Sequence, residues 1–221
     1  GVIPLSKANP SKDVLKRYQF LQKFKKESKQ FGSQRQASET IAVRIAMENL
    51  ARTAGFSDPI RLQWAMETKE AQEIIENSKN IEFGDTKVCL EIDEHGKSSI
   101  FALKGDKKLK TIPAKYKKEK QLIKLKEYNK ILREQYRRTK KSLEIAMING
   151  DMFSSEEMET LFTHPVVAPM LKKLVLVSEG NIGFWKEGKL NTIAGIESDF
   201  GKEIKIAHCV DLFDSGTWSA F

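Results

Sequence analysis

Residues 114–149 read AKYKKEKQLIKLKEYNKILREQYRRTKKSLEIAMIN, and this stretch decides the fold. It contains neither glycine nor proline, and Gly150 follows it directly. Apolar or small residues recur at steps of three and four: Leu122, Leu125, Leu132, Tyr136, Thr139, Leu143 and Ala146, with Asn129 completing the spacing. The pattern predicts one long helix that packs lengthwise against another helix and ends at Gly150.

Upstream of this helix, the chain is expected to begin with an extended arm over residues 1–10, followed by three helices. The first helix is predicted from Ser11, as its cap, to about residue 30. The second begins near Ser33, which has the capping-box spacing to Gln36. The third spans 59–77, because an aspartate and then a proline precede its apolar pattern.

Between these helices and the long helix, the hydrophobic period changes from 3.6 to 2. Val88, Leu90 and Ile92 alternate with polar residues, and a second apolar run covers 100–103 after a turn at 94–97. A third run covers 109–112 and is closed by a proline. These runs predict a three-stranded antiparallel meander.

Downstream, Ser154 and Glu157 have the spacing of a capping box and predict a short helix, which the pair His164-Pro165 ends. A further helical segment is expected within 166–173. Apolar runs at 174–177, 182–185, 190–193 and 204–207 predict a second meander. The fold class is therefore α+β: N-terminal helices and two small antiparallel meanders, separated by one long basic helix and a short helix.

The expected domain organisation is the arm 1–10, a part 11–113 with the N-terminal helices and first meander, and a part 114–221 with the long helix and second meander. One continuous domain is the alternative. The chain begins with Gly1 and stops at Phe221 just after Trp218, so we interpret it as a fragment truncated at its C-terminus.

The positive charge of the chain is concentrated in one segment. The whole chain has a net charge of +8, whereas residues 104–141 hold 16 basic and 4 acidic residues, a net of +12. This segment predicts a surface that binds nucleic acid or an acidic protein, and its excess of lysine favours sequence-independent contact. The alternative is that the charges only solvate an exposed helix. The predicted polyanion-binding residues are Lys107, Lys108, Lys110, Lys115, Lys117, Lys118, Lys124, Arg133, Arg137 and Arg138.

A reaction signature is missing from the sequence, which has no phosphate-binding glycine loop, HExxH, CxxC or GxSxG motif. We therefore assign no catalytic residue, metal or cofactor. His208 and Cys209, with Asp211, are the densest reactive cluster, but the preferred interpretation is a buried cysteine at a strand end. His164 is expected to act as a cationic ring at a helix end. An enzyme that uses these groups, with an active site completed by the missing C-terminal part, is the alternative.

The cellular setting is predicted from two observations. No apolar run reaches the ~18 to 20 residues that span a bilayer, so we expect no membrane partner. Cys89 and Cys209 lie far apart in the sequence and form no disulfide framework, which favours the reducing cytoplasm.

Several scattered segments carry a family resemblance: 50–56, 61–65, 109–113, 143–147, 161–166, 174–175, 183–184 and 206–208. Over roughly residues 34–221 the chain resembles a bacterial domain-of-unknown-function family of large molybdate-metabolism-regulator-like proteins, which often carry a WGR module elsewhere. The resemblance implies a regulatory role. Together with the basic segment and the missing reaction signature, it predicts a non-catalytic regulatory or interaction module whose partners include the rest of its parent chain. It brings no catalytic residue, and Cys209 stands where family members have proline.

Overall fold

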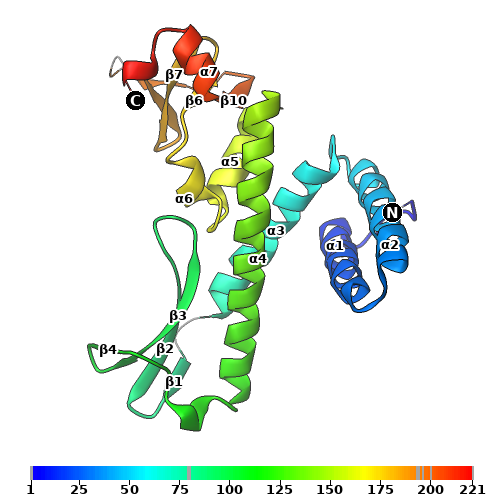
Figure 1. Cartoon of the computed structure of the whole chain (residues 1–221), viewed down its shortest axis with the longest axis vertical. Helices are drawn as coiled ribbons and strands as arrows, with labels where there is room; N and C mark the ends of the chain where they lie inside the picture. The colour runs from blue at the N-terminus through cyan, green and yellow to red at the C-terminus, as the bar shows by residue number, and fades with distance from the viewer. Residues whose placement is uncertain (1, 79–80, 193–194, 196, 200, 221) are drawn as a thin grey trace. The chain divides into compact units, whose positions relative to one another are not determined.

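The computed structural model describes residues 2–78, 81–192, 195, 197–199 and 201–220 (Figure 1). Gly1, Ile193 and Phe221, which entered the sequence predictions, lie outside these residues. The chain groups into two compact units, Gly1–Glu70 and Ala71–Phe221, and each is described by itself. The α+β class is confirmed, because helices come first and two antiparallel sheets follow.

The first unit is built from helices. These are α1 (Pro10–Glu27), the 3₁₀ turn η1 (Ser28–Gln30), α2 (Ser33–Thr53) and the first part of α3 (Pro59–Asn77). Their inward faces form a core of Val14, Leu15, Tyr18, Val43, Met47, Leu50, Ala51, Leu62 and Met66. Inside this core the Tyr18 hydroxyl donates to the carboxylate of the fully buried Glu67 over 2.7 Å, which satisfies a phenol that would otherwise lose its hydrogen bond to water.

The helix caps differ from two of the three predictions, although α2 begins at Ser33 as predicted. Asn9, and not Ser11, caps α1: its side chain accepts the Lys12 amide, and Pro10 occupies the first helical position. The capping box at Ser33 does not form, because Gly32 is the N-cap of α2 and offers no side chain. The aspartate before α3 does cap it, since Asp58 accepts the backbone amides at positions 60 and 61.

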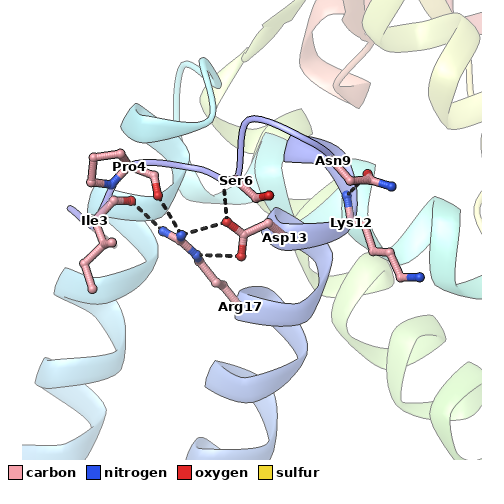
Figure 2. Close-up of polar contacts among 7 residues, drawn as sticks. All are labelled: Ile3, Pro4, Ser6, Asn9, Lys12, Asp13 and Arg17. Atoms are coloured by element: carbon pink, nitrogen blue, oxygen red, sulfur yellow. Dashed lines mark hydrogen bonds and ion pairs between the residues drawn. The ribbon is translucent and has the colours of Figure 1, made fainter.

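The N-terminal arm is tied to α1 by one arginine (Figure 2). The Arg17 guanidinium donates to the carbonyl oxygens of Ile3 (2.6 Å) and Pro4 (2.9 Å). It also holds both carboxylate oxygens of Asp13, at 3.0 and 2.7 Å, and Asp13 in turn accepts the Ser6 amide. The Ser6 amide and then Arg17 lower the pKa of Asp13. The predicted arm is therefore held against the helix by three hydrogen bonds, two from the Arg17 guanidinium to arm carbonyls and one from the Ser6 amide to Asp13.

The second unit begins with an antiparallel sheet in the order β1-β2-β3-β4, made of β1 (Ile81–Phe83), β2 (Thr86–Ile92), β3 (Ser98–Lys104) and β4 (Lys107–Leu109). The β2–β3 hairpin agrees with the prediction, and Val88 pairs with Ala102 in its register. Two details differ: β1 was not predicted, and the last strand lies at 107–109 and not at 109–112.

The long helix α4 (Lys120–Asn149) follows the 3₁₀ turn η2 (Ala114–Tyr116), so it begins six residues later than the sequence suggested. Its buried residues are Leu122, Leu125, Leu132, Gln135, Thr139, Leu143 and Ala146. The first two share a core with Val88 and Ala102 of β2 and β3, whereas Leu132 shares one with Ala71 and Ile74 of α3. The face that was expected to pack along another helix therefore does so over only part of its length. Gly150 ends the helix in the left-handed conformation, as predicted.

The chain continues with β5 (Met152–Phe153), α5 (Ser155–Thr163) and α6 (Ala168–Leu171). The capping box of Ser154 and Glu157 is confirmed. The strands β6 (Leu176–Ser178), β7 (Asn181–Lys186), β8 (Lys189–Thr192), β9 (Glu197–Ser198) and β10 (Ile204–Ile206) form a sheet ordered β5-β10-β6-β7-β8-β9. Because β10 returns to pair between β5 and β6, this sheet is more than the predicted meander. The described chain then forms α7 (Cys209–Asp214) and η3 (Trp218–Ala220).

The tip of the β2–β3 hairpin lies against the turn that leads into α6. Gly96 has φ +82°, and a Cβ built on it would lie 2.2 Å from the backbone oxygen of Val166. Only glycine allows this close approach, which places the neighbouring His95 near α6. Among the described residues, we find no helix whose length and hydropathy would let it cross a membrane.

Candidate functional site

Nearly all the cations of the basic segment 104–141 are exposed. Fifteen of its sixteen cations are exposed, and Arg138 is half-buried. Seven of them lie on the β3–β4 hairpin and on the connection through η2, and nine lie on α4. The first group lies on strands and loops and the second on a helix, so the two groups present their charges in different arrangements.

On α4 five cations form a line that we call the basic stripe: Lys126, Lys130, Arg133, Arg137 and Lys141. Their spacing is four, three, four and four residues. Because successive helical residues are rotated by about 100°, all five lie within an arc of about 80° on one side of α4. The rise of about 1.5 Å per residue extends the stripe over about 22 Å.

The basic stripe is not neutralised by contacts within the described part of the chain. None of its five cations has a carboxylate oxygen within 4.0 Å among these residues, whereas Lys104 pairs with Asp85 at 2.7 Å and Lys140 with Glu144 at 3.8 Å. Five like charges on one helical face repel each other, which costs stability. Such a face has its charges available for an external polyanion.

The remaining predicted residues do not join this line. Lys124 and Arg138 lie on the opposite flank of α4, about 180° and 140° from Arg133 by helical geometry. Lys107 and Lys108 belong to the edge strand β4, with the Lys108 ammonium 4.2 Å from the centroid of a phenylalanine ring. The others, Lys110, Lys115, Lys117 and Lys118, lie on the connection to α4.

Three members of the basic stripe were missing from the sequence prediction: Lys126, Lys130 and Lys141. The helical spacing from Arg133 and Arg137 was the signal that identifies them, since it repeats at i, i+4, i+7, i+11 and i+15. The ten predicted residues were chosen by density of charge along the chain. The density of charge along the sequence does not distinguish residues on opposite sides of a helix.

The tyrosines near the basic residues are used inside the unit. Tyr116 stacks on Phe83 with ring centroids 4.8 Å apart, and its hydroxyl donates to the Phe83 carbonyl. Tyr128 and Tyr136 pack on the core beside Leu132. They do not form a platform for stacked bases, so the surface offers charge and not aromatic stacking.

His164 differs from its prediction. It follows α5 as the C-cap, but its side chain is fully buried, and burial lowers its pKa from 6.5 to about 3. Nδ1 accepts the Val166 amide at 3.1 Å, which leaves the proton on Nε2. The ring is therefore neutral and structural, and the expected cation at the helix end is wrong because desolvation outweighs the helix dipole.

The pair His208 and Cys209 also differs from its prediction. Cys209 is exposed and opens the helix α7, so it is neither buried nor at a strand end. His208 is the N-cap: its Nδ1 accepts the Val210 amide, and its own amide donates to Asp211. The thiol lies 3.7 Å from His208 Nδ1, but that nitrogen is occupied by the cap. This arrangement explains the helix start without a catalytic role.

Two tryptophans of the second unit were also considered as ligand contacts, and neither forms a site. Trp185 stacks on Phe162 at 4.0 Å and has the Lys172 ammonium 5.2 Å from its ring, so its faces are occupied. Trp218 is 55% exposed. Within the residues that the structure describes, no three His, Cys, Asp or Glu side chains gather where they could hold a metal ion.

Comparison with family models gives two matches. Residues 106–221 match a domain of unknown function (DUF4132), and residues 1–66 match a family of unknown function (DUF5724). The second match ends close to the boundary between the two units at Glu70. No curated protein and no solved structure matches the chain.

Proposed function

The chain belongs to the DUF4132 family of unknown function, and from its charge distribution we propose that it is a non-catalytic module whose basic stripe binds the phosphate backbone of nucleic acid. The observation that carries the proposal is the line of five exposed cations on one side of α4. Closely spaced lysines and arginines release the counterions that condense on a phosphate backbone, and this release drives binding.

The type of contact follows from the residues available. Three of the five cations are lysines, which contact phosphates as point charges and carry no base preference. The nearby tyrosines are packed inside the unit. We therefore propose contact with the backbone of a duplex or single strand, without reading of the sequence.

The wider role is proposed from the resemblance described above. We place the module in the cytoplasm, as a regulatory or interaction part of a large bacterial protein of the molybdate-metabolism-regulator type. Cys89 and Cys209 are not joined in a disulfide, which supports a reducing compartment. An acidic protein surface, including one in the rest of the parent chain, is the competing partner for the same charges.

The test is a titration of a fluorescent 20-base-pair duplex, and of one of its strands, with the whole chain at 50, 100 and 200 mM salt. If all five stripe cations contact phosphates, the slope of log K against log salt is about −4.5 for the duplex and about −3.5 for the strand. Between 50 and 200 mM this predicts a loss of affinity of roughly 500-fold for the duplex.

The decisive variant changes Lys126, Lys130, Arg133 and Arg137 to glutamine. It is expected to reduce the salt slope to about −1, because one cation remains. The matched control removes the same net charge from α1 by changing Lys12, Lys16, Lys23 and Lys25 to glutamine, and it should keep the slope. Absence of binding at 50 mM salt, or an equal loss in both variants, excludes the proposal. Binding to polyglutamate alone would identify the acidic-protein alternative.

A further inference from the structure

The second unit contains a hollow that the basic stripe does not use. It has a volume of about 270 Å³, and its lining comes from three segments: the tip of the β2–β3 hairpin, one flank of α4, and the end of α6 with the residues after it. We call it the α4 hollow. Its lining residues are His95, Tyr136, Lys140, Leu143, Glu144, Met147, Met170, Lys173 and Leu174.

The floor of the α4 hollow is apolar. Leu143 is buried, and Tyr136, Met147, Met170 and Leu174 are half-buried around it. A cavity of about 150 Å³ lined by apolar side chains is enough to hold benzene, so this volume accepts an aromatic ring or a short aliphatic chain. The two methionines adapt their shape to different ligands.

The rim of the α4 hollow is charged, and it includes the ammonium group of Lys173. Lys173 Nζ lies 2.7 Å from His95 Nδ1. An ammonium has only protons to give, so His95 accepts through Nδ1 and carries its own proton on Nε2, which points to Glu94 at 3.4 Å. This contact fixes the Lys173 ammonium at the rim and leaves it two further donors.

The charge balance of the rim selects the ligand. Lys140 and Lys173 are positive, and Glu144 is negative and lies 3.8 Å from Lys140. The two ammonium groups and one carboxylate of the lining therefore leave one excess positive charge. One excess positive charge above an apolar floor complements a ligand with one negative charge and an apolar body.

We propose that the α4 hollow is a binding site for a small apolar monocarboxylate, with the body of the ligand between Met147 and Met170 and its carboxylate on Lys173. The site is built by the fold, because the close approach of Gly96 to Val166 holds the hairpin tip, and hence His95, beside α6. The proposal is independent of nucleic-acid binding, since none of the five stripe residues lines the hollow.

The test uses the whole chain labelled with ¹³C at the methionine methyl groups. The chain has six methionines. Two of them line the hollow, while Met47, Met66, Met152 and Met158 lie elsewhere and serve as internal controls. The probes are 3-phenylpropionate and its neutral amide. We expect saturable shifts of the Met147 and Met170 signals alone, with the carboxylate binding about tenfold more tightly than the amide.

The variant Lys173→Met removes the proposed anchor and should abolish the preference for the carboxylate while the amide still binds. Lys173→Arg keeps a charge there and should retain most of the preference. Lys141→Met, which removes a cation outside the hollow, should leave it unchanged. Unmoved Met147 and Met170 signals, equal affinity for the two probes, or an equal effect of Lys141→Met would each overturn the proposal. If Lys173→Met unfolds, which the four control signals report, the comparison of probes on the unchanged chain decides.

Discussion

The contact between Gly96 and Val166 gives a prediction whose size follows from the structure. In Gly96→Ala the new methyl group would lie 2.2 Å from the Val166 carbonyl oxygen, a backbone atom that cannot rotate away. In addition, φ is +82°, a region that costs a residue with a Cβ about 1–2 kcal/mol. Forcing extra volume into a packed contact costs about 1–3 kcal/mol more. We therefore expect unfolding free energy to fall by about 2–5 kcal/mol.

The matched control for this substitution is Gly188→Ala. Gly188 also lies in a hairpin turn of the second unit and has φ +85°, but a Cβ there meets nothing within 4 Å. Its substitution should cost only the backbone term of about 1–2 kcal/mol. The assay is urea unfolding followed by circular dichroism, with the melting temperature as a second readout. At about 2–4 °C per kcal/mol for a unit of this size, Gly96→Ala should melt roughly 4–20 °C lower.

The result that refutes this reasoning is a Gly96→Ala variant no less stable than Gly188→Ala. It would mean that the hairpin tip does not rest on the turn before α6, and that the wall of the α4 hollow formed by His95 is not held in place. Equal protection of the tip amides from hydrogen exchange in the unchanged chain and in Gly96→Ala would lead to the same conclusion.

Two further predictions concern His164 and the N-terminal arm. Burial lowers the pKa of His164 to about 3, so the unfolded chain binds a proton below pH 6.5 that the folded chain rejects, and stability should fall by about 2 kcal/mol between pH 7 and pH 5. His164→Asn, which keeps an acceptor near Nδ1 but cannot titrate, should remove this part of the pH dependence, and identical profiles would contradict it. Arg17→Ala should speed exchange of the Ser6 amide, because it removes the Arg17 contacts drawn in Figure 2 that hold the arm and orient Asp13, the acceptor of that amide. Lys16→Ala should not, and equal exchange in both would show that Arg17 does not hold the arm.

The parts of the fold that were predictable depend on residues close together in the sequence. Gly150 ends α4 because glycine reaches the left-handed conformation easily, and the box of Ser154 and Glu157 forms within one helical turn. The start of α1 was also readable, since Asn9 is followed by proline at the first helical position. The predicted cap at Ser11 was wrong although the sequence contained this Asn-Pro signal.

The parts that were not predictable depend on distant partners. The strands β1, β5 and β9 have two or three residues each, too few to show a period. The place of β10 between β5 and β6 is set by pairing across the unit, and the unit boundary at Glu70 falls inside the continuous helix α3. Likewise, His164 is buried and neutral because of tertiary packing, and no pattern in the neighbouring sequence indicates this.

The two proposed sites differ in the same way. The basic stripe repeats within one helix, so its residues follow from the sequence once α4 is predicted. The α4 hollow is formed by three segments that are distant in the sequence. The contact between His95 and Lys173 therefore exists only in the folded chain and could not be predicted.

Both sites depend on how α4 divides its circumference. One side is buried against β2 and β3 and, at Leu132, against Ala71 and Ile74 of α3, which fixes the rotation of the helix about its axis. That rotation sends the basic stripe to solvent, and it brings Tyr136, Leu143 and Met147 to the flank that faces His95 and α6. A change that turned α4 would therefore disturb both sites together, whereas loss of a single cation from the stripe or of Lys173 from the rim should disturb one alone. Separate responses to these single changes are what two independent sites on one rigid helix require.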